Sequence, residues 1–285
     1  MKRLLKIFWF SIFEKSPRTI LGNLLYPFMT ARVQKIMVSF FTSQEEDFIG
    51  RCLKEAINDR YYRQDDETIL RENRTKFWGA SHSRSWHDHH EKEAARNYAE
   101  RMKFKTPLVE WIKVYAKANN LQLICDVGTG MGHFLFILRE EVSKVSICNF
   151  VGLDLNKACI EEANKRNHYP DVVFLHSDAR EFISEKGVPN SLYVFCGTME
   201  YFTQNELENI LELIKAKKPA AIAISEPINL DIKKEYDSQP RGNIAFSHNY
   251  VHLFNKHGYR VVHKKIDQID PKIPFYDNVM MLAEV

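Results

Sequence analysis

A glycine-rich turn behind an acidic residue is the strongest chemical signal in the sequence. An apolar segment ends at Asp126, and glycines follow at 128, 130 and 132 before an amphipathic stretch begins. The spacing is not the dinucleotide fingerprint, because His133 stands where its last glycine would be, and it is not a Gly-Lys-Ser/Thr phosphate loop. Glycines let a ligand approach the backbone closely. The turn therefore predicts a ligand without a pyrophosphate group.

Two further carboxylates end the next two apolar segments. Asp154 closes VGLDL, and Asp178 lies in HSDA. Carboxyl ends of parallel strands form the edge at which open α/β sheets bind ligands, and an acid at the second strand end can accept both ribose hydroxyls. An anionic Asp126 attracts a cation, and a helix N-terminus attracts a carboxylate. S-adenosylmethionine has these groups and no phosphate, so it fits the three positions.

The elements that must hold these residues are short apolar runs alternating with amphipathic helices. Strands are expected at Leu121–Val127, Ile147–Asp154, Val172–His176, Leu192–Cys196, Ala220–Ser225, Tyr259–Lys264 and Val279–Val285. Helices are expected at Gly132–Val142, Lys157–Asn167, Ala179–Glu185, Gln204–Lys215 and Asn249–His257. Continuous apolar strands separated by helices predict an α/β fold with a parallel sheet covered on both faces. No helical pattern separates the last two strands, so the final strand is expected to be antiparallel.

Residues 121–285 resemble a class I S-adenosylmethionine-dependent methyltransferase. CDVGTGMG resembles the family's first motif, GLDL the second, SDA the third, and LYVFCGTMEYF the fourth strand with its following loop. The resemblance implies a seven-stranded sheet of order 3-2-1-4-5-7-6 with strand seven antiparallel, and S-adenosyl-L-methionine as cofactor. The cofactor-binding residues it implies are Asp126, Gly128, Thr129, Gly130, Asp154, Leu155, Asp178, Ala179 and Cys196.

Within that set, Gly128, Thr129 and Gly130 are expected to wrap the methionyl part, Asp154 to hold the ribose, and Asp178 with Ala179 to frame the adenine. One departure concerns strand four. Its first acid, Glu200, comes four residues after Cys196. This argues against a catechol-type magnesium site, and no metal is expected.

Methyl transfer from a sulfonium is an in-line displacement that depends mainly on alignment, and a hydroxyl acceptor also benefits from a general base. The predicted catalytic candidates are His248, Glu200 and Glu226, with His133 as a further possibility. Each also has a purely structural interpretation, such as a charge beside a helix N-terminus. The expected reaction is O-methylation of a small-molecule, sugar or lipid-linked acceptor. The alternatives are N-methylation of a small amine, or a membrane-associated scaffold that binds the cofactor without turnover.

Positive charge concentrates at the N-terminus. The net charge is +3, yet residues 1–40 hold seven cations and one anion, so the remainder sums to −3 and predicts no nucleic-acid groove. The charge-free run Ile7–Phe13 is too short to span a bilayer. A basic amphipathic arm over residues 1–40 suits either a membrane surface, through residues 1–30, or packing on its own domain or on a second subunit as a homodimer.

Five scattered cysteines without Cys-x-x-Cys spacing predict a reducing, cytoplasmic location, peripheral at the inner membrane surface if the arm binds lipid. The predicted domains are a helical cap over residues 1–118 and a cofactor-binding domain over residues 119–285. Within the cap, Pro107 is expected to open a helix at its first turn. A cluster that could close over the cofactor as a lid, or hold a metal, comprises His82, His87, His89 and His90 with Glu91 and Glu93, flanked by Trp78, Trp86 and Tyr98.

Overall fold

The computed structural model describes residues 17–29, 31–32, 47–53, 56, 78, 105–228, 238–241, 245–268 and 277–285. The chain divides into two compact units, residues 1–77 with 242–244, and residues 78–241 with 245–285. The predicted boundary at 118/119 falls inside the second unit. Helix 105–119 belongs there because Leu108 and Ile112 share a buried apolar cluster with Ile124 of the first sheet strand.

The described part of the first unit is helical. α2 spans Pro17–Leu25, η1 spans Tyr26–Phe28, and residues 48–53 are helical. A close approach joins the two helices, since a Cβ added to Gly22 would lie 1.8 Å from the Cys52 carbonyl oxygen. The part of the arm before residue 17 lies outside the described residues. Among those that the structure describes, no helix is long and apolar enough to cross a membrane.

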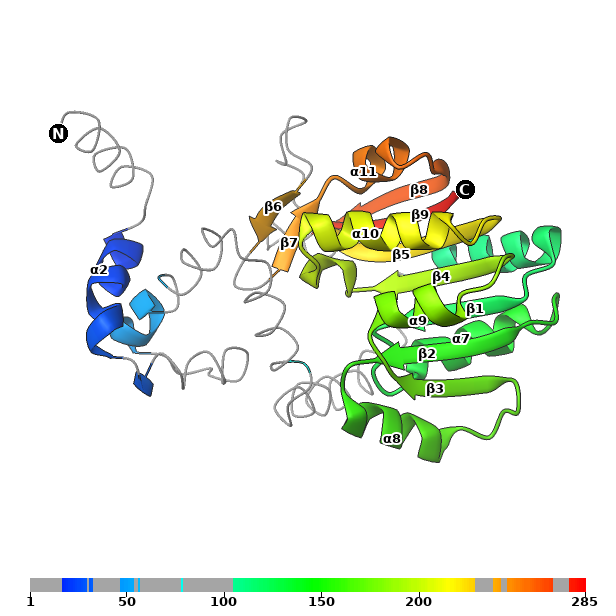
Figure 1. Ribbon diagram of the computed structural model, residues 1–285, viewed down its shortest axis with the longest axis horizontal. Coiled ribbons are helices and arrows are strands. Elements are labelled where there is room, and N and C mark those ends of the chain that lie inside the picture. The colour runs from blue at the N-terminus through cyan, green and yellow to red at the C-terminus, as the bar shows by residue number, and fades with distance from the viewer. Residues whose placement is uncertain are drawn as a thin grey trace. The chain divides into compact units, whose positions relative to one another are not determined.

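The second unit is built on a seven-stranded sheet, whose order is β3-β2-β1-β4-β5-β9-β8 (Figure 1). The strands are β1 Leu123–Val127, β2 Asn149–Asp154, β3 Val172–His176, β4 Ser191–Cys196, β5 Ala220–Ile228, β8 Arg260–Gln268 and β9 Asp277–Glu284. The first five are parallel, and β9 runs antiparallel to both β5 and β8. Both the predicted order and the reversed final strand are confirmed.

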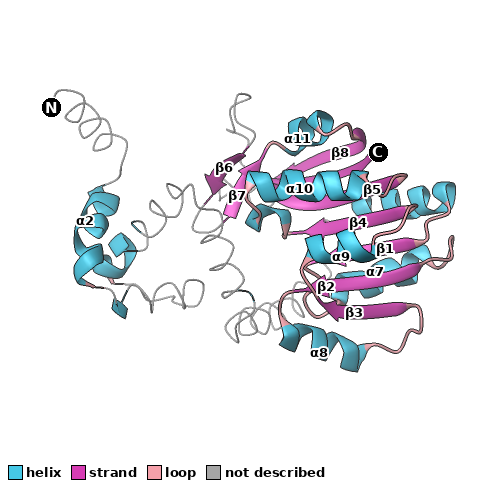
Figure 2. Ribbon diagram, viewed as in Figure 1, coloured by secondary structure: helices cyan, strands magenta, loops and turns pink. Residues whose placement is uncertain are grey.

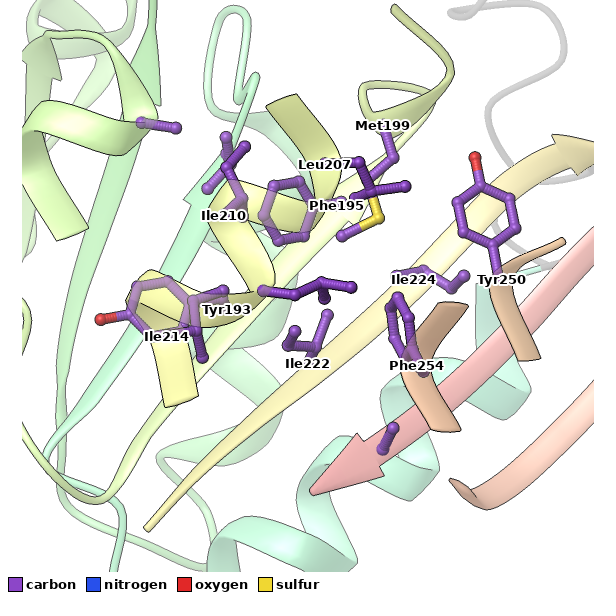
Figure 3. Close-up of a cluster of buried hydrophobic side chains, with 14 of the residues drawn as sticks. Tyr193, Phe195, Met199, Leu207, Ile210, Ile214, Ile222, Ile224, Tyr250 and Phe254 are labelled. Carbon is purple, nitrogen blue, oxygen red and sulfur yellow. The ribbon is translucent and has the colours of Figure 1, made fainter. Parts of the chain in front are cut away.

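Helices cover both faces of this sheet (Figure 2). They are helix 105–119, α7 His133–Val142, α8 Lys157–Arg166, α9 Ala179–Lys186, α10 Gln204–Lys215 and α11 Tyr250–Lys256. One buried cluster joins the sheet to helix 105–119, α7 and α8, and the other joins it to α9, α10 and α11. Successive strand residues point to opposite faces. Ile222 and Ile224 of β5 therefore face α10 and α11 in the cluster of Figure 3, while Ala221 and Ala223 face the other cluster.

A short hairpin lies between β5 and α11 in the chain. β6 (Ser238–Arg241) pairs antiparallel with β7 (Ala245–His248), and β5 itself continues to Ile228. Pro240 explains why the sequence did not reveal β6, since proline cannot donate to a strand ladder and argues against a central strand. A two-stranded ribbon has edges that tolerate it. The hairpin matters for the site because it delivers His248.

Candidate functional site

The glycine turn after β1 has the backbone conformation that its sequence predicts. Gly128, Gly130 and Gly132 all have positive φ, at 75°, 56° and 81°, which favours glycine strongly over other residues. The amides of Gly128 and Thr129 both donate to the Leu153 carbonyl of β2, at 2.8 and 2.9 Å. The turn is therefore hydrogen-bonded to the neighbouring strand, β2. α7 begins directly after the turn.

Asp126 is a buried acid beneath this turn. Its carboxylate is 2% exposed and accepts a hydrogen bond from the Thr129 hydroxyl at 2.7 Å. Burial raises the pKa of Asp126 to about 6, against the lowering effects of the Thr129 hydrogen bond and the Lys105 charge. A carboxylate in this condition is stabilised by a nearby cation.

Asp154 ends β2 beside the same turn. Its Oδ2 accepts from the Gly130 amide and its Oδ1 from the Asn156 amide, both at 2.8 Å. The side chain is only half-buried, and the Leu155 carbonyl that follows lies 3.0 Å from Nε2 of His176. Asp154, the predicted ribose-binding residue, thus lies at the sheet edge beside the glycine turn.

Asp178 lies at the next strand end, in an ion pair. It caps α9 by accepting from the Arg180 amide at 2.8 Å, and its Oδ2 binds the Arg180 guanidinium at 2.8 Å. Ala179 opens the helix and is buried. An adenine amine would share this carboxylate with Arg180, so the predicted adenine contact stays a prediction.

The turn after β4 meets the glycine turn directly. A Cβ added to Gly128 would lie 2.3 Å from the Thr198 hydroxyl oxygen, so only glycine admits Thr198 here. Cys196, which ends β4 and precedes this turn, has a pKa raised by burial to about 12 and is therefore a neutral thiol near pH 7. Met199 points into the apolar cluster shown in Figure 3 and is fully buried. The turn is thus packed on both sides.

Glu226 holds the backbone of that turn. It is 0% exposed, and its carboxylate accepts from the amides of Thr198 at 2.9 Å, Met199 at 3.0 Å and Glu200 at 3.3 Å. Burial raises the pKa of Glu226 to about 7, opposed by these hydrogen bonds and by Lys105. Backbone amides therefore engage both carboxylate oxygens of Glu226.

His248, at the end of β7 in the hairpin, contacts the backbone of the same turn. Its Nε2 lies 3.2 Å from the Met199 carbonyl and its Nδ1 lies 2.6 Å from the Ser238 hydroxyl. Burial lowers the pKa of His248 to about 4, so the ring is neutral near pH 7. A neutral ring that donates from Nε2 to the carbonyl and accepts at Nδ1 from Ser238 satisfies both contacts. In this geometry both ring nitrogens are used within the chain, which favours a structural role.

Glu200 is the third predicted catalytic residue, and it belongs to the turn itself. Its side chain is 6% exposed, and its Oε1 lies 3.9 Å from the Cβ position of Gly197. The structure therefore brings all three candidates, Glu200, Glu226 and His248, to one turn. His133, by contrast, is exposed at the start of α7, where its Nε2 lies 3.1 Å from Arg166.

Lys105 is a member of the site that the sequence analysis missed. Its ammonium lies 4.6 Å from the Phe134 ring centroid, and its charge acts on Asp126, Cys196 and Glu226. It belongs to the helix whose described residues are 105–119. Lys105 supplies a positive charge that acts on both buried carboxylates, Asp126 and Glu226.

The predicted lid is described at one of its aromatic residues. The Trp78 ring meets the Tyr201 ring edge-on, with centroids 4.8 Å apart, and so contacts the element that follows the β4 turn. Trp86, Tyr98 and the histidine cluster from His82 to His90 lie outside the described residues. The lid and metal interpretations of that cluster stay predictions.

The donor set fits a cationic, phosphate-free ligand. Asp126 and Glu226 are buried carboxylates with raised pKa values, so an added positive charge would stabilise their ionised forms. Asp154 offers acceptors to hydroxyl groups, and the glycine turn offers close backbone approach. When bound, S-adenosylmethionine supplies an electrophilic methyl group on a sulfonium. The chain's own contribution is to align that methyl group and to exclude water.

A family model described as a methyltransferase domain matches residues 124–217. No curated protein matches the chain. Among solved structures, the chain is similar to magnesium protoporphyrin IX methyltransferase from Synechocystis, at 13% identity over 85% of this chain and 99% of that one, with a TM-score of 0.47. It is also similar to the N-methyltransferase NodS from Bradyrhizobium japonicum, at 10% identity over 65% and 95%, with a TM-score of 0.49.

The family match, the strand order and the glycine turn together define a class I S-adenosylmethionine-dependent methyltransferase domain. The match over residues 124–217 accordingly marks the chain as an S-adenosylmethionine-dependent methyltransferase, with S-adenosyl-L-methionine as its cofactor.

Proposed function

We propose that this protein transfers the methyl group of S-adenosylmethionine to a hydroxyl group of a small-molecule, sugar or lipid-linked acceptor. The observation that carries the proposal is the position of Glu200. Its carboxylate lies on a turn whose Thr198 abuts Gly128 of the glycine turn. A base on that turn would be near the methyl group that the glycine turn helps to position.

Glu200 is proposed as the base because it is the candidate that lies within the turn itself. The Glu226 carboxylate is occupied by three backbone amides, and His248 uses both ring nitrogens within the chain. In the proposed reaction, the Glu200 carboxylate accepts the hydroxyl proton as the acceptor oxygen attacks the methyl carbon. A new carbon–oxygen bond forms, the carbon–sulfur bond breaks, and its electron pair leaves with the sulfur. A general base of this kind typically contributes 10²–10⁴-fold to the rate.

The cofactor contacts proposed for this reaction follow the geometry of the strand ends. Gly128, Thr129 and Gly130 would surround the methionyl part above Asp126, and Asp154 with Leu155 would hold the ribose. Asp178 and Ala179 would border the adenine, with Cys196 beside the cofactor. The acceptor is proposed to enter beside Trp78 and Tyr201, whose rings are in contact.

A labelled-methyl assay against separated pools of hydroxyl and amine compounds tests the proposal. We expect label in the hydroxyl pool, and we expect Glu200→Gln to reduce transfer by at least about tenfold without weakening cofactor binding. Glu185→Gln, which alters an exposed acid on α9, is the control. Label confined to amines would establish the N-methyltransferase alternative, and cofactor binding with no acceptor in either pool would favour the scaffold.

The N-terminal arm belongs to the same proposal, since a lipid-linked acceptor would lie at a membrane surface. Aromatic and basic residues over 1–30 suit anionic lipid. Deleting residues 1–30 should then reduce sedimentation with anionic liposomes while cofactor binding persists. Equal sedimentation of the two proteins, or a change of the full chain from dimer to monomer on deletion, would assign the arm to packing instead.

A further inference from the structure

Glu226 is a charged residue in an apolar row. It follows Ile222 and Ile224 along β5 at alternate positions, so its side chain leaves the sheet on the face of the α10 and α11 cluster. Ile228, two residues further, also belongs to that cluster. An isolated carboxylate would be strongly disfavoured here. Its burial must therefore be offset by specific partners.

Those partners are the consecutive amides of one turn. Oε1 of Glu226 accepts from Thr198 and Met199, and Oε2 accepts from Glu200. Bonds from amides to an ionised carboxylate are stronger than bonds between neutral groups. A single side chain from β5 thus determines the path of the backbone that follows β4.

The same turn is connected to the cofactor side of the site. Thr198 occupies the space that a side chain at position 128 would need. Glu200 carries the proposed base. A shift of the turn would therefore move Thr198 relative to the glycine turn and Glu200 relative to the acceptor. His248 restrains the turn from the opposite side by contacting the Met199 carbonyl.

We propose that Glu226 is a positioning residue of the methyltransferase, whose ionised carboxylate fixes the turn at 197–200 and thereby sets both Thr198 against the glycine turn and Glu200 toward the acceptor. The claim that Glu226 orients Glu200 rests on the proposed function. The claim that Glu226 fixes the turn against the glycine turn holds whatever the acceptor is.

The first test observes the turn directly in the full-length, ligand-free protein. In a nuclear magnetic resonance titration from pH 5 to 8.5, we expect the amide signals of Thr198, Met199 and Glu200 to shift together as Glu226 ionises. The charged and titratable groups that face Glu226 or its turn are Lys105, Asp126, Cys196, Glu200 and His248. In Glu226→Gln, the shared shift should disappear while any contribution of Asp126 remains. Amide signals that are identical at the two ends of the range in the wild-type protein would overturn the proposal.

The second test measures binding of S-adenosylhomocysteine by calorimetry. Loss of the charged acceptor in Glu226→Gln should weaken binding about fivefold or more, as expected from at least one lost hydrogen bond. Ser225→Ala is the matched control, because Ser225 is the preceding residue, is buried, and bonds Asn278 of β9 at 3.1 Å. It should bind within about twofold of wild type.

The outcomes separate the two proposals. If Glu226→Gln and Ser225→Ala bind S-adenosylhomocysteine equally, the positioning role is overturned. If the wild-type protein binds it and the amides titrate, but no hydroxyl acceptor is methylated, the positioning role stands and the proposed acceptor chemistry fails. A Glu226→Gln protein that does not fold leaves the wild-type amide titration to decide the first claim.

Discussion

Gly128 and Thr198 belong to different strand ends, yet a single added methyl group at position 128 would come 2.3 Å from the Thr198 hydroxyl oxygen. The glycine turn and the turn after β4 are therefore fitted to each other. Contact at this distance makes the glycine turn and the turn after β4 one packed unit. The predictions below use this contact and the buried charges around it.

Replacing Gly128 by alanine should damage the site more than the backbone strain alone would. A left-handed conformation costs a non-glycine residue about 1–2 kcal/mol, and the clash with Thr198 adds to it. Gly197→Ala is a matched control. Gly197 also has a positive φ, of 69°, but a Cβ added there would have Oε1 of Glu200 as its nearest neighbour, at 3.9 Å. Urea unfolding should show a larger loss for Gly128→Ala, accompanied by weakened S-adenosylhomocysteine binding. Equal losses in the two variants would mean that Thr198 moves aside freely.

Removing the Asp154 carboxylate charge should weaken cofactor binding. In Asp154→Asn the ribose hydroxyls and the Gly130 amide compete for one remaining oxygen, so we expect a loss of about 2 kcal/mol, or roughly 30-fold in affinity. Calorimetry with S-adenosylmethionine measures it. Asp171→Asn, which removes an acid paired with Arg139, provides the control. An unchanged affinity in Asp154→Asn would refute the ribose placement.

Affinity for S-adenosylmethionine should rise with pH between about 5 and 8. The pKa values of Asp126 and Glu226 are raised by burial to about 6 and about 7, so both groups carry protons at the acid end of this range. A cationic ligand favours their ionised forms, and binding should therefore release protons. Calorimetry in buffers of different ionisation enthalpy counts them. S-adenosylhomocysteine lacks the sulfonium charge and should release fewer. Equal proton release by both ligands would argue against a sulfonium beside these carboxylates.

Stability should also depend on the ionisation of Glu226. A pKa raised from 4.5 to about 7 means that the folded state holds the proton more tightly, so this contribution is complete below pH 4.5 and is lost as pH rises through 7. The difference corresponds to about 3 kcal/mol. In Glu226→Gln the free energy of unfolding should fall less between pH 5 and pH 8 than in the wild type. Parallel pH profiles from urea unfolding would contradict the raised pKa.

The alternation of apolar runs and amphipathic helices was sufficient to predict the sheet. Each of the seven expected strands is present within four residues of its predicted ends, and the order and the reversed β9 are confirmed. Local patterns succeed here because burial on both faces demands apolar residues throughout a parallel strand. The hairpin of β6 and β7 was missed because Pro240 and the polar residues around it carry no such pattern.

The sequence by itself determined the fold, the positive-φ glycines and the carboxylates at successive strand ends, because these follow from periodicity and from the conformational freedom of single residues. Only the tertiary structure decided which polar groups are free to act. Glu226 and His248 have the residue types of catalytic bases, but burial and hydrogen bonds to one turn engage them within the chain. Lys105 shows the converse, since its charge acts on two carboxylates, Asp126 and Glu226, that are distant from it in sequence. Solvation and pairing, which set reactivity, are properties of the folded neighbourhood.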